Sequence, residues 1–221
     1  MSAMVSPERP DSTVMSALAD DAAYEQRCAD DALWTGNRLL IGLSAFAFAS
    51  LGFSYFYLRS ANNFHLWRPG GVTAPTGIGA AIFAVMVATA VLFYYGVRRL
   101  RAGSVVDWEV AGWVSVGGGL LALALQIWEL TSLGFSPGSS GYASLFVAWG
   151  GLNIAVLVGV TYWVETLVAR SLRLRLALRE EGGANAQLTS PSFKMSCDAA
   201  AYFLWYVAGA ELVFWILFYA I

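Results

Sequence analysis

Five long apolar runs dominate this chain of 221 residues and constrain its fold more than any other feature. Each run is close to the roughly twenty residues that an α-helix needs to cross the hydrocarbon core of a bilayer. Backbone polar groups find no partners in lipid, so such runs cross it as helices. We therefore predict an all-α fold, a polytopic membrane bundle of five transmembrane helices, at approximately residues 39–58, 77–97, 111–133, 143–168 and 199–221.

Composition agrees with a membrane protein. Hydrophobic residues make up 58% of the chain and charged residues 13%, whereas about a quarter of an ordinary soluble domain is charged. The net charge of -2 argues against a nucleic-acid partner, because phosphate binding needs a clustered basic surface.

We divide the chain into an acidic segment, 1–35, and a five-helix transmembrane domain, 36–221. The acidic segment lacks the pattern of a signal peptide, and both a short interfacial helix and a disordered tail are compatible with it.

The basic residues predict the orientation, because cytoplasmic loops collect lysine and arginine. The loops after the second and fourth crossings hold three and five basic residues, whereas the loop between the third and fourth holds none. We expect the two basic loops and the amino-terminal segment to be cytoplasmic and the carboxyl terminus to be external. The expected location is a bacterial-type inner (plasma) membrane.

Four polar side chains within the crossings need an explanation, since insertion scales penalise each by about 2 to 4 kcal/mol. Gln126 and Glu129 are three residues apart and share one helix face. Asn153 lies in the fourth crossing, where an interhelical hydrogen bond is its usual use. Glu211 lies near the midpoint of the fifth crossing, where burial favours the neutral acid. We regard Glu211 as the strongest candidate for a functional side chain, although a hydrogen bond to a neighbouring helix would also explain it.

Small and aromatic residues suggest how the helices pack. We expect glycines to allow close helix approach, as is usual in membrane bundles, at Gly117, Gly118, Gly119, Gly150, Gly151 and Gly159. Four tryptophans fall near the predicted boundaries and are interpreted as interface anchors: Trp34, Trp67, Trp108 and Trp163.

Candidate metal ligands are few. His65 is the single histidine, and the cysteines, Cys28 and Cys197, match no metal-binding spacing. We therefore expect no catalytic residue, no metal site and no cofactor in this chain.

Four stretches in order carry a resemblance to a known family. They are the aromatic helix from Ser44 to Arg59, the motif Gln126-Ile-Trp-Glu129, the segment Tyr142-Ala-Ser-Leu-Phe146, and the aromatic last helix from Tyr202 to Tyr219. Together they resemble subunit III of the haem-copper oxidases, in its five-helix form, over roughly Trp34 to Ile221. The second and third stretches are similar to the family's Gln-x-x-Glu and Tyr-Gly-Ser-x-Phe-Phe.

The chain departs from the family pattern at ionisable positions. The family's acidic residue in the first of these helices aligns with Ala45, and its pair of histidines aligns with Leu152 and Ala155. The histidine and aspartate of its last helix align with Trp205 and Ala208. Roles tied to those side chains do not carry over, which leaves Gln126, Glu129 and the aromatic and glycine framework.

The resemblance implies an accessory, cofactor-free component of a respiratory terminal oxidase, a cytochrome c oxidase. Such a component packs on catalytic subunit I and supports its stability and proton uptake in aerobic electron transport. Haem and copper are then expected in the partner, and the other partners are further respiratory complex subunits and membrane lipids.

Two alternatives remain open. One is the subunit-III-like protein associated with nitric oxide reductase, which also has five helices. The other is a small membrane transporter built around Glu211, Asn153 and Glu129, although five crossings do not divide into equal inverted halves.

Overall fold

Helices make up the architecture of this protein. The computed structural model describes residues 12–61, 67–177 and 190–221, and within these ranges there is no strand. Among the described residues, five helices are long and apolar enough to cross a membrane, which confirms the predicted all-α bundle. The elements are α1 (Ser12–Ser60), α2 (Thr76–Arg101), α3 (Val105–Thr131), α4 (Gly141–Ala177) and α6 (Pro191–Trp215), which continues into a π-helix, η1 (Ile216–Ala220).

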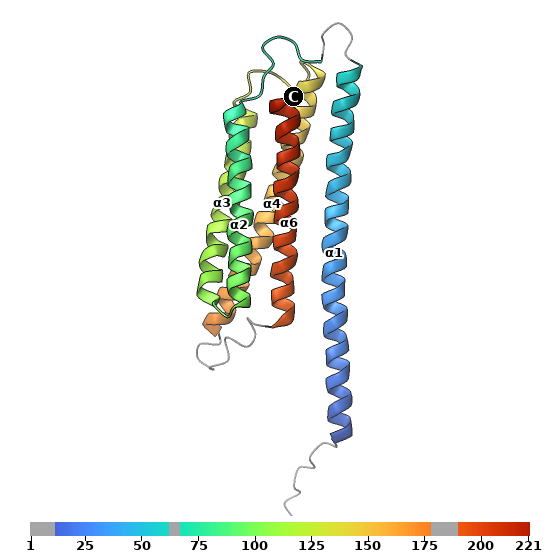
Figure 1. Ribbon diagram of the computed structural model, residues 1–221, viewed down its shortest axis with the longest axis vertical. Coiled ribbons are helices and arrows are strands. Elements are labelled where there is room, and N and C mark those ends of the chain that lie inside the picture. Colours follow the sequence, from blue (N-terminus) through green and yellow to red (C-terminus); the bar gives the residue numbers. More distant parts are fainter. Residues whose placement is uncertain (1–11, 62–66, 178–189) are drawn as a thin grey trace, which may run out of the picture.

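Four of the described helices form one bundle, and the first helix, α1, packs against its side. Figure 1 shows α2, α3, α4 and α6 packed together, with α1 at one side, where it packs mainly on α6 and α4. A tight turn joins α2 to α3 and contains Gly103 at φ 89°, a conformation that glycine adopts without strain. This turn and the start of α6 lie at one end of the bundle, which we name the turn end, and the carboxyl terminus lies at the other.

The amino-terminal segment is helical from Ser12 onward and runs without a break into the first predicted crossing. Of the two alternatives left open by the sequence, the helix is therefore the one present from residue 12, as an extension of α1 rather than a separate element. The first turns of α1 project past the turn end of the bundle (Figure 1). Residues 1–11, His65 and Arg179 lie outside the described residues.

Two further helices, α4 and α6, reach well beyond the apolar runs that predicted them. α4 continues from the predicted boundary at Val168 to Ala177, and α6 begins at Pro191 rather than at Ala199. Ser190 caps α6 by accepting a hydrogen bond from the Phe193 backbone N–H, and proline at the first helical position suits a helix start. Because α6 starts earlier, Glu211 lies nearer its carboxyl end than the predicted midpoint.

Buried apolar side chains form two clusters, and aromatic rings are prominent in both. Trp108 belongs to the cluster near the turn end, where it packs against Phe93 and Phe193 with ring centroids 5.2 and 6.2 Å away. The interpretation of Trp108 as an interface anchor was wrong, since its side chain is fully buried. The reason is that α3 already begins at Val105, and Trp108 lies on the side of its first turns that faces the bundle.

Close helix approach depends on only some of the predicted glycines. A Cβ atom added at Gly118, Gly119 or Gly150 would collide with Thr89, Thr161 or Leu130 respectively. The prediction was wrong for Gly117, Gly151 and Gly159, where an added Cβ would meet nothing within 4 Å. No neighbouring helix comes within contact distance at these positions, and Gly159 lines an open groove opposite Leu40 and Ser44 of α1, which periodicity along the sequence does not reveal.

Candidate functional site

The four polar residues singled out from the sequence lie together in the structure. Asn153 on α4 is at the centre, and its side-chain Nδ2 donates two hydrogen bonds. One goes to Gln126 Oε1 on α3 at 2.8 Å, and the other goes to Glu211 Oε1 on α6 at 2.6 Å. The Asn153 amide therefore links three helices inside the apolar bundle.

The hydrogen bonds continue from Gln126 toward the carboxyl-terminal end of the chain. Gln126 Nε2 donates to Glu129 Oε2 at 2.9 Å, and the Tyr219 hydroxyl donates to Glu129 Oε1 at 2.5 Å. We name these five connected side chains the polar chain: Glu211, Asn153, Gln126, Glu129 and Tyr219. It runs from α6 through α4 and α3 and back to the helical segment η1.

Burial explains why these groups are connected. Asn153 and Glu129 are 0% exposed, Gln126 is 1% exposed and Glu211 is 5% exposed. Polar groups removed from water cost free energy unless they are hydrogen-bonded. Interhelical hydrogen bonds in membrane proteins contribute about 0.6 kcal/mol on average. The main effect of the polar chain is therefore to fix the positions of the helices relative to one another, and its contribution to stability is small.

Tyr219 was not singled out from the sequence. An aromatic residue at the end of an apolar helix is usually an interface anchor, and that pattern concealed its role. The spacing did carry a signal, because Glu211, Trp215 and Tyr219 follow one another at intervals of four and so share a helix face.

A second polar contact near the turn end was also missed. Glu109 is 6% exposed, and its carboxylate pairs with Arg175 at 2.8 Å and accepts a hydrogen bond from Ser171 at 3.2 Å. Two further ion pairs lie nearby, Arg99 with Asp107 and Arg101 with Asp198. The sequence did contain a signal for this contact. Acidic residues precede the third crossing and basic residues follow the fourth, so both groups were expected at the same end of the bundle.

Metal ligands are not clustered in the described ranges. Among residues 12–61, 67–177 and 190–221, no group of three or more histidine, cysteine, aspartate or glutamate side chains could hold a metal ion. Within the same ranges, Cys28 and Cys197 are free thiols, the first exposed and the second buried. The chemistry that the described site offers is hydrogen bonding and proton exchange at Glu129, Glu211 and Tyr219.

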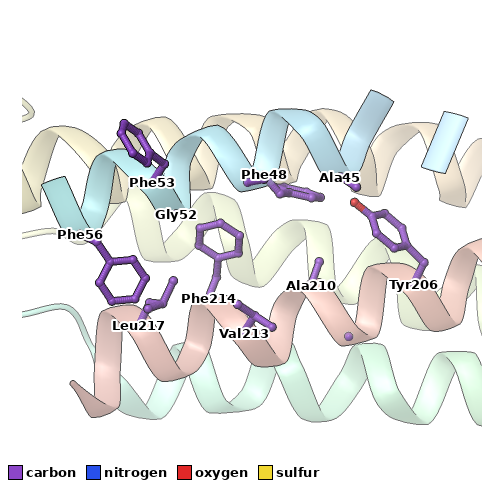
Figure 2. Close-up of a pocket in the computed structure, with 12 residues that line it drawn as sticks. Ala45, Phe48, Gly52, Phe53, Phe56, Tyr206, Ala210, Val213, Phe214 and Leu217 are labelled. Atoms are coloured by element: carbon purple, nitrogen blue, oxygen red, sulfur yellow. The ribbon is translucent and has the colours of Figure 1, made fainter. Parts of the chain in front are cut away.

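An apolar groove of about 710 Å³ lies between α1 and α6. Figure 2 shows Phe48 and Phe56 of α1 directed toward α6, opposite Phe214 and Tyr206. Small residues, among them Gly52, leave the space open. In a membrane this groove suits an acyl chain or an apolar side chain of another protein.

Aromatic residues pack near the polar chain, at the end of the bundle that holds the carboxyl terminus. The Tyr142 hydroxyl donates to the Phe218 carbonyl oxygen at 2.8 Å, and the guanidinium carbon of Arg68 lies 4.6 Å from the centroid of the Tyr142 ring. Phe214 stacks on Trp149 with centroids 4.1 Å apart. These contacts hold η1 and the end of α6 against α4.

Sequence comparisons identify no relative: no protein-family model matches the chain, and no curated protein matches it.

Proposed function

We propose that this protein is an accessory subunit, without a cofactor of its own, of a respiratory terminal oxidase of the cytochrome c oxidase type. It packs on the catalytic subunit, which carries haem and copper, and supports the stability and proton uptake of that subunit in aerobic electron transport. In this proposal the chain lies in a bacterial-type inner membrane with its amino terminus in the cytoplasm and its carboxyl terminus outside.

One observation carries the proposal: of the four stretches that resemble subunit III, each of the first three contacts the last. Tyr219 donates to Glu129, and Tyr142 donates to the Phe218 carbonyl oxygen. From the first stretch, Phe48 packs against Phe214 with ring centroids 5.6 Å apart. A shared subunit III scaffold would require contacts of this kind.

The surface of α1 supports a docking role. Its apolar span is 11% buried within the chain, against 33% to 50% for the other four spans. Large apolar side chains point outward along it, including Leu43, Phe46 and Phe53 at 70%, 76% and 72% exposure. In the proposal this face of α1 packs on the catalytic subunit.

The charged ends of the helices support the orientation. Arg98, Arg99 and Arg101 end α2 at the turn end, and Arg173 and Arg175 lie near the end of α4. Positive charge retained on the cytoplasmic side is the usual arrangement. The opposite end carries the carboxyl terminus (Figure 1).

The test is purification of the full chain from its native membranes in mild detergent, followed by identification of the copurifying proteins by mass spectrometry. The proposal predicts the catalytic subunit of a terminal oxidase. A nitric oxide reductase in its place would support the related alternative, and recovery of the chain by itself would contradict both.

A matched pair of variants tests the docking face. Phe46→Ala on α1 should reduce recovery of the partner, whereas Tyr162→Ala on α4, at 66% exposure, should not. Equal recovery with both variants would rule out this face of α1 as the contact.

A small transporter is the second candidate, favoured by one observation. The polar chain connects Glu211, Asn153 and Glu129, the three residues around which that alternative was built. Proton or cation flux into liposomes containing the purified chain would support the transporter function. Flux equal to that of empty liposomes would exclude it.

A further inference from the structure

The two ends of the polar chain lie at one small cavity. Glu211 and Tyr219 both line it, together with Trp215, which lies between them on the same helix face. Gln126 lines it from α3 and Gly79 from α2. The cavity therefore adjoins the polar chain where α2, α3 and α6 meet.

The size and polarity of the cavity suit a single water molecule. It offers about 10 Å³ to the centre of a water molecule, which is the least that one water needs. A buried water also needs two to four polar partners. Glu211 and Tyr219 both line the cavity, and each carries a group able to bond to water.

Trp215 supplies the observation that points to a ligand. Its indole Nε1 is buried and has no hydrogen-bond partner in the part of the chain that the structure describes. Buried N–H groups are nearly always hydrogen-bonded to protein or to ordered water. A donor of this kind at a polar cavity of one-water size indicates what fills the space.

We propose that one water molecule occupies this cavity, accepts a hydrogen bond from Trp215 Nε1, and bonds to the Glu211 carboxyl and the Tyr219 hydroxyl. The water closes the polar chain into a ring. On one side of the ring, amides of Asn153 and Gln126 connect the two carboxyl groups. On the other side, the connection consists of water and a phenol.

The two sides of the ring differ chemically. Water and the tyrosine hydroxyl each accept and donate through the same oxygen, whereas an amide donates from nitrogen and accepts at oxygen. A proton leaving Glu211 can therefore pass to water, while water gives a proton to the Tyr219 oxygen and Tyr219 gives its own to Glu129. Every oxygen on this route ends with its original number of protons except the two carboxyl groups, which exchange one. This inference rests on the cavity and does not depend on the oxidase proposal.

Gly79 provides the means of testing the site. An alanine Cβ at this position would collide with the Tyr219 ring, so Gly79→Ala should displace the phenol and disrupt the cavity. Gly77 lies on the same helix, and a Cβ there would meet nothing within 4 Å. Gly77→Ala is therefore the matched control.

The experiment is nuclear magnetic resonance of the full chain in detergent, with the tryptophan indole nitrogens labelled with nitrogen-15. The Trp215 signal is assigned by its loss in Trp215→Phe. A cross-peak between the Trp215 indole proton and long-lived water is expected in the wild type and in Gly77→Ala, and its loss is expected in Gly79→Ala. The spectrum of the wild type tests the proposal even if Gly79→Ala does not fold. An assigned Trp215 signal in folded wild-type protein without a water cross-peak would overturn the proposal. An unchanged cross-peak in folded Gly79→Ala would also overturn it.

Discussion

Asn153 and Glu211 are joined across two helices by a hydrogen bond of 2.6 Å in which the amide of Asn153 is the donor. Both side chains are buried, and Asn153 donates to Gln126 at the same time. This places Glu211 in a structural network whatever further role it has, so conservative and disruptive changes at residue 211 should have different effects.

The first prediction concerns Glu211. Glu211→Gln keeps a side-chain oxygen that can accept from Asn153, so the free energy of unfolding should stay nearly unchanged. Glu211→Leu leaves the Asn153 donor without that partner and should lower the free energy of unfolding by about 1 to 3 kcal/mol. Reversible denaturation in detergent measures both values.

The same pair of variants separates a structural role from a proton-transfer role toward a partner. We expect the purified complex containing Glu211→Gln to keep nearly all of its turnover. A complex that assembles normally with this change but loses most of its oxygen-reduction rate would show that the carboxyl proton is needed for turnover.

A second prediction concerns the ion pair of Glu109 with Arg175. Arg175→Ala leaves a mostly buried carboxylate without its cation, and we expect a loss of about 1 to 3 kcal/mol in the free energy of unfolding. The control is Arg99→Ala, because Arg99 and Asp107 are both well exposed and exposed ion pairs contribute little to stability. Equal losses in the two variants would mean that burial does not distinguish the pairs.

A third prediction concerns the groove between α1 and α6. Gly52→Leu places a side chain in that space and should reduce the number of phospholipids that stay bound after delipidation, as counted by native mass spectrometry. Gly42→Leu on the same helix adds the same side chain at a position that does not line the groove, and it should leave the count unchanged. Unchanged lipid retention in Gly52→Leu would exclude the groove as a lipid site.

The number of crossings could be predicted because lipid imposes a strict rule: a backbone inside it must be helical, and each helix needs about twenty apolar residues. Outside lipid that rule no longer applies. The sequence therefore did not decide whether the segment before the first crossing is helical or disordered, although α1 begins at Ser12. The start of the last helix was predicted too late in the sequence, since α6 begins at Pro191.

The candidate site was partly predictable for a similar reason. Polar residues in lipid must find partners, so Gln126, Asn153 and Glu211 stood out. Which of them pair depends on how each helix is rotated about its axis, and the sequence does not state this. Trp108 was missed as a buried residue, and Tyr219 as a hydrogen-bonding partner, because aromatic side chains near a helix end occur both at interfaces and inside bundles.

A fourth prediction concerns orientation. A reporter fused after Arg101, at the basic end of α2, should be active in the cytoplasm, and one inserted between Ser136 and Ser140 should be active outside. The two sites lie at opposite ends of the bundle, so the result must reverse between them. Reporters on the same side, or with the sides exchanged, would contradict the proposed topology.

The most direct test of the proposed function is the reduced-minus-oxidised absorption spectrum of the complex that copurifies with the full chain from its native membranes in mild detergent. An accessory subunit of a haem-copper oxidase should bring with it haem in a fixed ratio to this chain, together with oxygen-reducing activity. Phe46→Ala on the exposed face of α1 should lower that ratio, and Tyr162→Ala should not. A wild-type preparation that contains the intact chain without haem or oxidase activity would contradict the account.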